Sequence, residues 1–182
     1  QIGQGKLPQD DSKAVSYYLM ANEKSDLFGQ YSLGLMYKWG RGGLPQDLQQ
    51  AVRLFRIGAQ RGYRFSQFAY GEALLEGKGV KKNEKEAGQW FLKGAGQGHQ
   101  ESQAYLGWFL ETGKGGFEKN LDKAVEAYQL SAVQGYQWAR DQLDRLGIDW
   151  RNFQSFSDVS QTHGKRSEDG VNDERVKLLE QR

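Results

Sequence analysis

The feature that most constrains this chain is a short motif that returns at a nearly constant spacing. Residues 3–10, Gly-Gln-Gly-Lys-Leu-Pro-Gln-Asp, recur almost unchanged at residues 40–47, which is 37 positions later. The Gly-x-Gly part returns at Gly77 after another 37 residues and at Gly113 after a further 36. Periods of this length are typical of helical repeat arrays, in which each unit buries its apolar face against its neighbours.

Each unit is predicted to contain two helices, of which the second is the more clearly marked. An Asp or Asn precedes every second helix and is expected to cap its N-terminus. These caps are Asp10, Asp47, Asn83 and Asn120. Gln50 and Glu86, three residues after their caps, predict a capping box in two of the units. An Ala, an aromatic residue and a small residue follow at spacings of four and three, so they share one helical face. The four sets are Ala14/Tyr18/Ala21, Ala51/Phe55/Gly58, Ala87/Phe91/Gly94 and Ala124/Tyr128/Ser131.

The first helix of each unit carries a glycine in its middle. The pairs are Leu33-Gly34, Tyr70-Gly71 and Leu106-Gly107, in helices expected over 27–39, 64–76 and 100–112. A glycine inside a helix costs about 1 kcal/mol relative to alanine. Three at equivalent positions therefore indicate a packing purpose, namely a partner helix lying tight against the backbone. A last helix, expected over 136–146, has Asp144 in place of this glycine and is interpreted as a terminal cap.

With these motifs in phase, the chain resembles the Sel-one-like repeat (SLR) family, which is related to the tetratricopeptide repeats. The segments that carry the resemblance in one unit are Ser66-Gln67, Tyr70-Gly71, Gly77-Lys78-Gly79, Glu86-Ala87, Trp90-Phe91 and Gly94-Ala95. The resemblance implies an all-α fold, a right-handed α-α superhelix or solenoid of about four helix-turn-helix repeats with a C-terminal cap, and a bacterial origin.

Two regions are expected along the chain. Residues 1–147 form the repeat array, with boundaries near 25/26, 62/63, 98/99 and 135/136. Residues 148–182 form a capping segment and a polar tail that caps the array, fills its groove or mediates self-association. The residues expected to cover the exposed end of the array are Ile148, Trp150, Phe153 and Phe156.

Composition excludes several classes of function. The 25 basic and 23 acidic residues leave a net charge of +2, which gives no electrostatic footprint for nucleic acid. No apolar run approaches the length of a membrane span, so no membrane insertion is expected. The absence of cysteine rules out disulfides and thiolate metal sites. The compartment stays open because Gln1 begins in the middle of a repeat, with a bacterial periplasm or envelope slightly favoured over the cytoplasm.

No motif in the sequence points to catalysis, a metal or a cofactor. His99 stands in an inter-repeat turn where other units carry Tyr63 and Tyr136, so we interpret it as an aromatic packing residue. His163 lies in the polar tail and is interpreted as solvated. The segment from Gly107 to Lys114 has five residues between its glycines where a phosphate-binding loop needs four.

The predicted function is that of a non-catalytic adaptor that binds a partner protein or peptide in a concave groove lined by the first helices. Positions between the packing residues are expected to face solvent there, unless they pack on adjacent helices or beneath the tail. The groove residues are Tyr31, Leu35, Lys38, Phe68, Glu72, Leu75, Trp108 and Glu111. Aromatic side chains rimmed by charge suit protein binding. The resemblance leaves two alternatives, a bacterial immunity protein that neutralises a phospholipase-type effector of type VI secretion, and a hydrolase of the rare SLR-associated kind.

Overall fold

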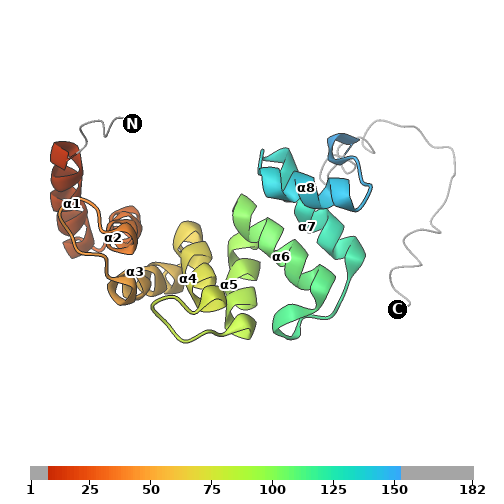
Figure 1. Ribbon diagram of the computed structural model, residues 1–182, viewed down its shortest axis with the longest axis horizontal. Helices are drawn as coiled ribbons and strands as arrows, with labels where there is room; N and C mark the ends of the chain where they lie inside the picture. The colour runs from red at the N-terminus through yellow and green to blue at the C-terminus, as the bar shows by residue number, and fades with distance from the viewer. Residues whose placement is uncertain (1–7, 153–182) are drawn as a thin grey trace, which may run out of the picture. The chain divides into compact units, whose positions relative to one another are not determined.

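The computed structural model describes residues 8–152, with side chains from residue 13 to residue 151. All of these but Asn152 belong to one compact unit, which runs from Gln1 to Arg151. Between residues 8 and 152 the chain forms eight α-helices and no strand (Figure 1). The helices are α1 Pro8–Glu23, α2 Leu27–Trp39, α3 Leu48–Gln60, α4 Arg64–Glu76, α5 Glu84–Gly96, α6 Gln100–Thr112, α7 Leu121–Val133 and α8 Gln137–Arg145. Two short 3₁₀ turns, η1 Lys114–Gly116 and η2 Trp150–Asn152, complete the described part.

Each helix packs mainly against the helices next to it in the chain, from α1 on α2 to α7 on α8. Figure 1 shows this order as a continuous run of colour through the unit. Such local packing is the defining property of a solenoid, in which every repeat contacts only its neighbours. The predicted all-α solenoid is confirmed. The even-numbered helices are the first helices of the repeats and the odd-numbered helices are the second ones.

The predicted bounds of α2, α4 and α6 agree with the structure residue by residue. The side chains of Asp47, Asn83 and Asn120 cap their helices as expected, each accepting the backbone N–H three residues later. The prediction that Asp10 is a cap is wrong, because α1 begins at Pro8. A proline in the first helical turn has no N–H to lose there, and its fixed φ suits a helix start.

The predicted capping boxes do not close, because the backbone N–H of each cap is used elsewhere. The N–H of Asn83 donates to the carbonyl of Leu74, near the end of the preceding helix, at 2.8 Å. Glu86 instead accepts from the side-chain amide of Asn83. Asp47 and Asn120 donate in the same way to the carbonyls of Tyr37 and Leu110, both at 2.9 Å. This hydrogen bond recurs in every loop between the two helices of a full repeat and fixes how far apart they lie.

The glycines inside the first helices lie under aromatic rings of the following second helices. A Cβ placed on Gly71 would lie 2.8 Å from Cε1 of Phe91, a separation too short for any real Cβ. The equivalent pairs in the other repeats are Gly34 with Phe55 and Gly107 with Tyr128. All three rings are essentially buried. The structure confirms that the glycines serve close packing and identifies the ring as the group that approaches the backbone.

The last helix is covered as the sequence predicts for a cap. Leu143 of α8 is completely buried, and Ile148 and Trp150 pack against its cluster. The guanidinium of Arg140 lies 4.1 Å from the centroid of the Trp150 ring, a distance suited to a cation–π contact. The other two residues predicted to cover this end, Phe153 and Phe156, lie outside the described residues.

Candidate functional site

The predicted groove residues lie on three successive first helices, α2, α4 and α6. All eight are half-buried. The apolar members pack against the hydrophobic core with part of their surface. These are Tyr31, Leu35, Phe68, Leu75 and Trp108. They are therefore less exposed than the sequence predicted. Tyr31 and Phe68 also contact rings of the next repeat, those of Phe65 and Tyr105.

The aromatic members belong to a longer continuous set of rings, which we call the aromatic row. It consists of Tyr31, Tyr63, Phe65, Phe68, His99, Tyr105, Trp108, Tyr136 and Trp138, contributed by α2, α4, α6, α8 and the turns before them. Neighbouring ring centroids along it lie between 5.0 Å, for Phe65 and His99, and 6.4 Å, for Tyr105 and Trp108. All its members except His99 are half-buried. The row therefore offers a partly exposed aromatic surface that spans several repeats.

His99 is the buried centre of the aromatic row. It is 6% exposed and its ring contacts Phe65 edge-on and Phe68 at 5.1 Å, which confirms its prediction as a packing residue. Its Nδ1 also accepts the backbone N–H of Ser102 at 3.3 Å, so it caps α6. Since Nδ1 accepts, the neutral ring carries its proton on Nε2, which lies 3.5 Å from the Glu101 carboxylate. Burial lowers the pKa of His99, although Glu101 acts against this shift.

The charged members of the predicted groove form ion pairs between repeats. Lys38 Nζ of α2 donates to Glu72 of α4 at 2.6 Å, and both side chains are about a quarter exposed. Glu111 of α6 accepts from the Tyr128 hydroxyl at 2.9 Å and from Arg145 of α8. These pairs lie partly in solvent, so each adds at most about 1 kcal/mol to stability. Their main effect is to place fixed, paired charges beside the aromatic row.

The tyrosines of the row stay neutral at physiological pH. Burial raises the pKa of Tyr31, with smaller contributions from Tyr63 and the nearby carboxylates Glu101 and Glu72. Burial also raises the pKa of Tyr136 to about 12. Because these phenols stay protonated, the hydroxyl groups of the row remain hydrogen-bond donors.

The sequence analysis missed a repeated set of buried amides, which we call the glutamine ladder. Gln67 and Gln103 lie at equivalent positions of α4 and α6 and are at least nine-tenths buried. Each accepts a hydrogen bond from the glutamine that directly follows the last residue of the next second helix. Gln97 donates to Gln67 at 2.7 Å and Gln134 to Gln103 at 2.6 Å. The signal was available, because a glutamine recurs at positions 30, 67 and 103 with the spacing of the repeat.

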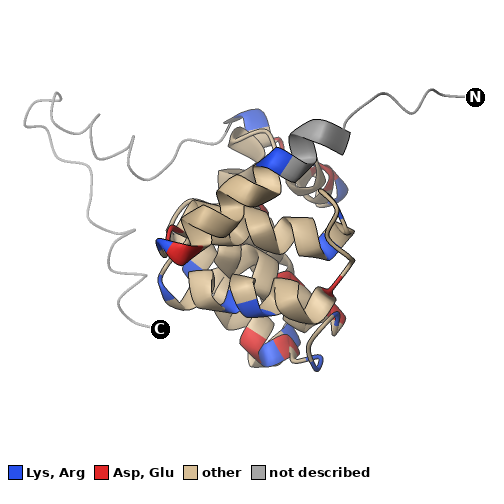
Figure 2. Ribbon diagram, turned by 90° about the vertical axis from the view of Figure 1, so that its left-hand side faces the viewer, with Lys and Arg blue, Asp and Glu red and all other residues tan. Residues whose placement is uncertain are grey.

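Within residues 13–151 no group of three or more His, Cys, Asp or Glu side chains is placed to hold a metal ion. Basic and acidic segments alternate along the ribbon, and neither sign dominates the view in Figure 2. No helix in the described part of the chain is long and apolar enough to cross a membrane.

Comparison with known proteins places this geometry among helical repeat proteins. The Sel1 repeat model matches four times, over residues 1–26, 27–63, 65–99 and 100–136. A comparison with curated protein sequences found no match to the chain. Among solved structures, a protective antigen of uropathogenic Escherichia coli with an SLR fold is 33% identical over 72% of this chain and 28% of its own, with a TM-score of 0.68. A Sel1 repeat protein from Oxalobacter formigenes is 32% identical over 70% of this chain and 52% of its own, with a TM-score of 0.62.

A third similar structure is the cysteine-rich protein B of Helicobacter pylori. It is 27% identical to this chain over 78% of the chain and all of its own length, with a TM-score of 0.56. The present chain has no cysteine and therefore forms its repeats without disulfides. It spans about a quarter of the length of the E. coli antigen and about half that of the Oxalobacter protein. The four matched repeats, the helix pairs and these structures together show that the chain belongs to the Sel1 repeat family.

Proposed function

We propose that this chain is a non-catalytic scaffold that holds a partner protein on the aromatic row. The observation that carries the proposal is the row itself, in which eight half-buried rings from successive repeats are linked by ring contacts, with the buried His99 joining Phe65 to Phe68. Aromatic side chains are enriched at protein interfaces because they bury a large area and have few rotatable bonds to fix. Membership of the Sel1 repeat family supports the same general role.

The surroundings of the row fit a protein partner better than a small molecule. The ion pair between Lys38 and Glu72 and the contact of Glu111 with Arg145 give the row a polar rim. Lys114 Nζ lies 4.4 Å from the centroid of the Trp108 ring and adds a cation at its edge. An apolar centre with a charged rim is the usual anatomy of a protein interface. The described residues offer no observation that favours either effector neutralisation or hydrolysis.

The proposal is tested by affinity capture from the source organism. The immobilised chain is compared with a Phe68→Ala/Trp108→Ala variant, which removes two anchors of the row. The matched control is Leu121→Ala/Val133→Ala, which truncates two exposed apolar residues of the second helix α7. Circular dichroism confirms that all three proteins are folded before capture.

Loss of two interface anchors is expected to cost at least about 2 kcal/mol, which corresponds to roughly a 30-fold weaker affinity. The wild type and the control are therefore expected to recover the same partner, and the row variant to lose it. Equal recovery by all three proteins would mean that the partner does not use the aromatic row.

A further inference from the structure

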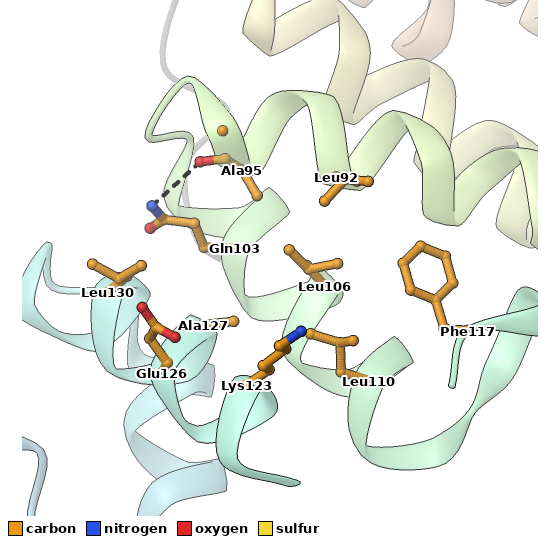
Figure 3. A pocket seen from close by; sticks show the side chains of 11 residues that line it. Leu92, Ala95, Gln103, Leu106, Leu110, Phe117, Lys123, Glu126, Ala127 and Leu130 are labelled. Carbon is orange, nitrogen blue, oxygen red and sulfur yellow. Dashed lines mark hydrogen bonds between the residues drawn. The ribbon is translucent and has the colours of Figure 1, made fainter. Parts of the chain in front are cut away.

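A second surface lies between the second helices α5 and α7, with α6 as its floor. It is a hollow of about 450 Å³, which is within the range of ligand-binding pockets. We call it the α5–α7 groove. Its apolar lining includes Leu92, Leu106, Leu110, Phe117, Ala127 and Leu130. Figure 3 shows side chains from α5, α6 and α7 around the same hollow. Leu92 at its edge is 51% exposed, so the apolar lining reaches the surface.

The repeat supplies an internal comparison for this groove. The corresponding surface one repeat earlier lies between α3 and α5, with α4 as its floor. There the positions of Leu106 and Ala127 are occupied by Tyr70 and Trp90. The two rings pack edge to face with centroids 5.6 Å apart. Glu86 accepts the Trp90 indole N–H at 3.3 Å and also lies 3.4 Å from the Tyr70 hydroxyl.

The α5–α7 groove therefore lacks an indole that its neighbour contains. Replacement of Trp by Ala127 and of Tyr by Leu106 removes both rings while the surrounding helices keep their packing. The position of Glu86 is taken by Lys123, and that of Gln89 by Glu126. Both side chains line the groove, and neither forms an ion pair with another described residue. The groove is apolar at its base and carries an unpaired cation and an unpaired carboxylate at its rim.

We propose that the α5–α7 groove binds a tryptophan side chain of a partner protein, with an acidic residue of that partner pairing with Lys123 and a basic residue pairing with Glu126. Trp90, which packs on Tyr70 of α4 one repeat earlier, shows that an indole fits over a first helix at this position of the repeat. The remaining volume accommodates the side chains next to the anchor, which favours a polypeptide over a free aromatic molecule. The groove has second helices as its walls and shares no lining residue with the aromatic row, so the inference does not depend on the function proposed above.

The test uses two probes and the full chain labelled at its leucine methyl groups. The probes are N-acetyltryptophanamide and a blocked tripeptide, Asp-Trp-Lys, with Asp-Ala-Lys as the matched peptide. In nuclear magnetic resonance titrations both indole probes are expected to shift the methyl signals of Leu92, Leu106, Leu110 and Leu130 saturably. A single anchor predicts a dissociation constant on the order of 1 mM. The tripeptide is expected to bind several-fold more tightly than the amide, and Asp-Ala-Lys is expected to give no shifts.

Three variants locate the site. Ala127→Trp fills the groove from within, as Trp90 does one repeat earlier, and is expected to raise Tm and abolish the probe-induced shifts. Val133→Trp adds the same indole to an exposed position of α7 and is expected to leave binding unchanged. Lys123→Gln is expected to reduce the advantage of the tripeptide over the amide. If Ala127→Trp does not fold, Ala127→Leu makes the same test with a smaller side chain.

The inference is overturned if the wild-type leucine signals do not respond to either indole probe. It is also overturned if the shifts persist when residue 127 fills the groove in a folded variant. Binding of the amide with no gain from the charged tripeptide would contradict the assignment of a protein segment and indicate a site for free aromatic molecules. Since none of these variants alters the aromatic row, their outcomes are distinct from those of the capture experiment.

Discussion

The ring of Phe91 lies against the backbone of Gly71, on the helix that precedes its own, closely enough to exclude any side chain there. The same relationship links Gly34 to Phe55 and Gly107 to Tyr128. It connects the repeated sequence to the stacked structure, because each glycine admits the ring that seals the space between two repeats. The cost of placing a glycine inside a helix is offset by the burial of an aromatic side chain of about 150–250 Å².

Substitution of this glycine is expected to destabilise the array. Gly71→Ala places a Cβ 2.8 Å from Cε1 of Phe91, and the ring has little room to move because it is completely buried. The better helix propensity of alanine returns about 1 kcal/mol, whereas overpacking costs about 1–3 kcal/mol. We therefore expect a net loss of up to about 2 kcal/mol in the free energy of unfolding, measured by urea denaturation.

A glycine elsewhere in the chain provides the control. Gly96, near the end of α5, has no atom within 4 Å of its hypothetical Cβ. Gly96→Ala is therefore expected to stabilise the chain by a few tenths of a kcal/mol to about 1 kcal/mol. If both substitutions shift the unfolding midpoint in the same direction, close packing is not the reason for the glycine in α4.

The glutamine ladder is expected to contribute through coupling between its members. Gln97 donates to the buried Gln67 at 2.7 Å, and Gln67 also donates to the carbonyl of Ala59. In a double-mutant cycle of Gln67→Ala and Gln97→Ala, the two single substitutions are expected to be less than additive by about 0.5–1.5 kcal/mol. Chemical denaturation of the four proteins gives the coupling energy, and a value of zero would show that this hydrogen bond contributes nothing to stability.

His99 is expected to make the stability of the chain dependent on pH. Burial lowers the pKa of His99 below its value of 6.5 in the unfolded chain. Below that pH the unfolded chain therefore binds more protons than the folded one, so the free energy of unfolding falls as pH decreases from 7.5 to 5. The slope from one such group is at most about 1.4 kcal/mol per pH unit. Denaturation curves recorded across this range measure it.

The control for this prediction is taken from the other repeats. Tyr63 and Tyr136 occupy the positions equivalent to His99, so His99→Tyr keeps an aromatic ring in a position that already accommodates one. The variant loses the cap on Ser102 and is expected to be less stable at pH 7.5. Its loss of stability between pH 7.5 and pH 5 is expected to be smaller than that of the wild type. An identical pH dependence would exclude His99 as the responsible group.

Much of the fold was predictable because the repeat encodes it several times. The spacing of Gly34, Gly71 and Gly107 located the first helices, and the capping Asp and Asn residues located the second ones. The capping boxes were predicted wrongly because a local pattern does not reveal a competing acceptor. The carbonyl of Leu74 becomes available only when the loop folds back, and it takes the N–H that Glu86 was expected to receive.

The candidate site was less predictable. Their spacing from the mid-helix glycines placed the predicted groove residues on the first helices. This spacing could not show that the rings of Phe68 and Tyr105, which belong to successive repeats, are in contact. The α5–α7 groove left no positive signal in the sequence, because it results from a small residue, Ala127, where the preceding repeat has Trp90. A hollow of this kind emerges only when equivalent positions are compared in three dimensions.

The most direct test of the central claim is site-specific photo-cross-linking of the partner in the source organism. A photoreactive phenylalanine derivative is introduced in place of Leu75, on the face of α4 that carries Phe68, or in place of Ile57, an exposed residue of α3. If the partner lies on the first helices, irradiation is expected to give a covalent adduct from position 75 and none from position 57. An adduct from position 57 alone would show that the partner binds elsewhere and would contradict the proposed role of the aromatic row.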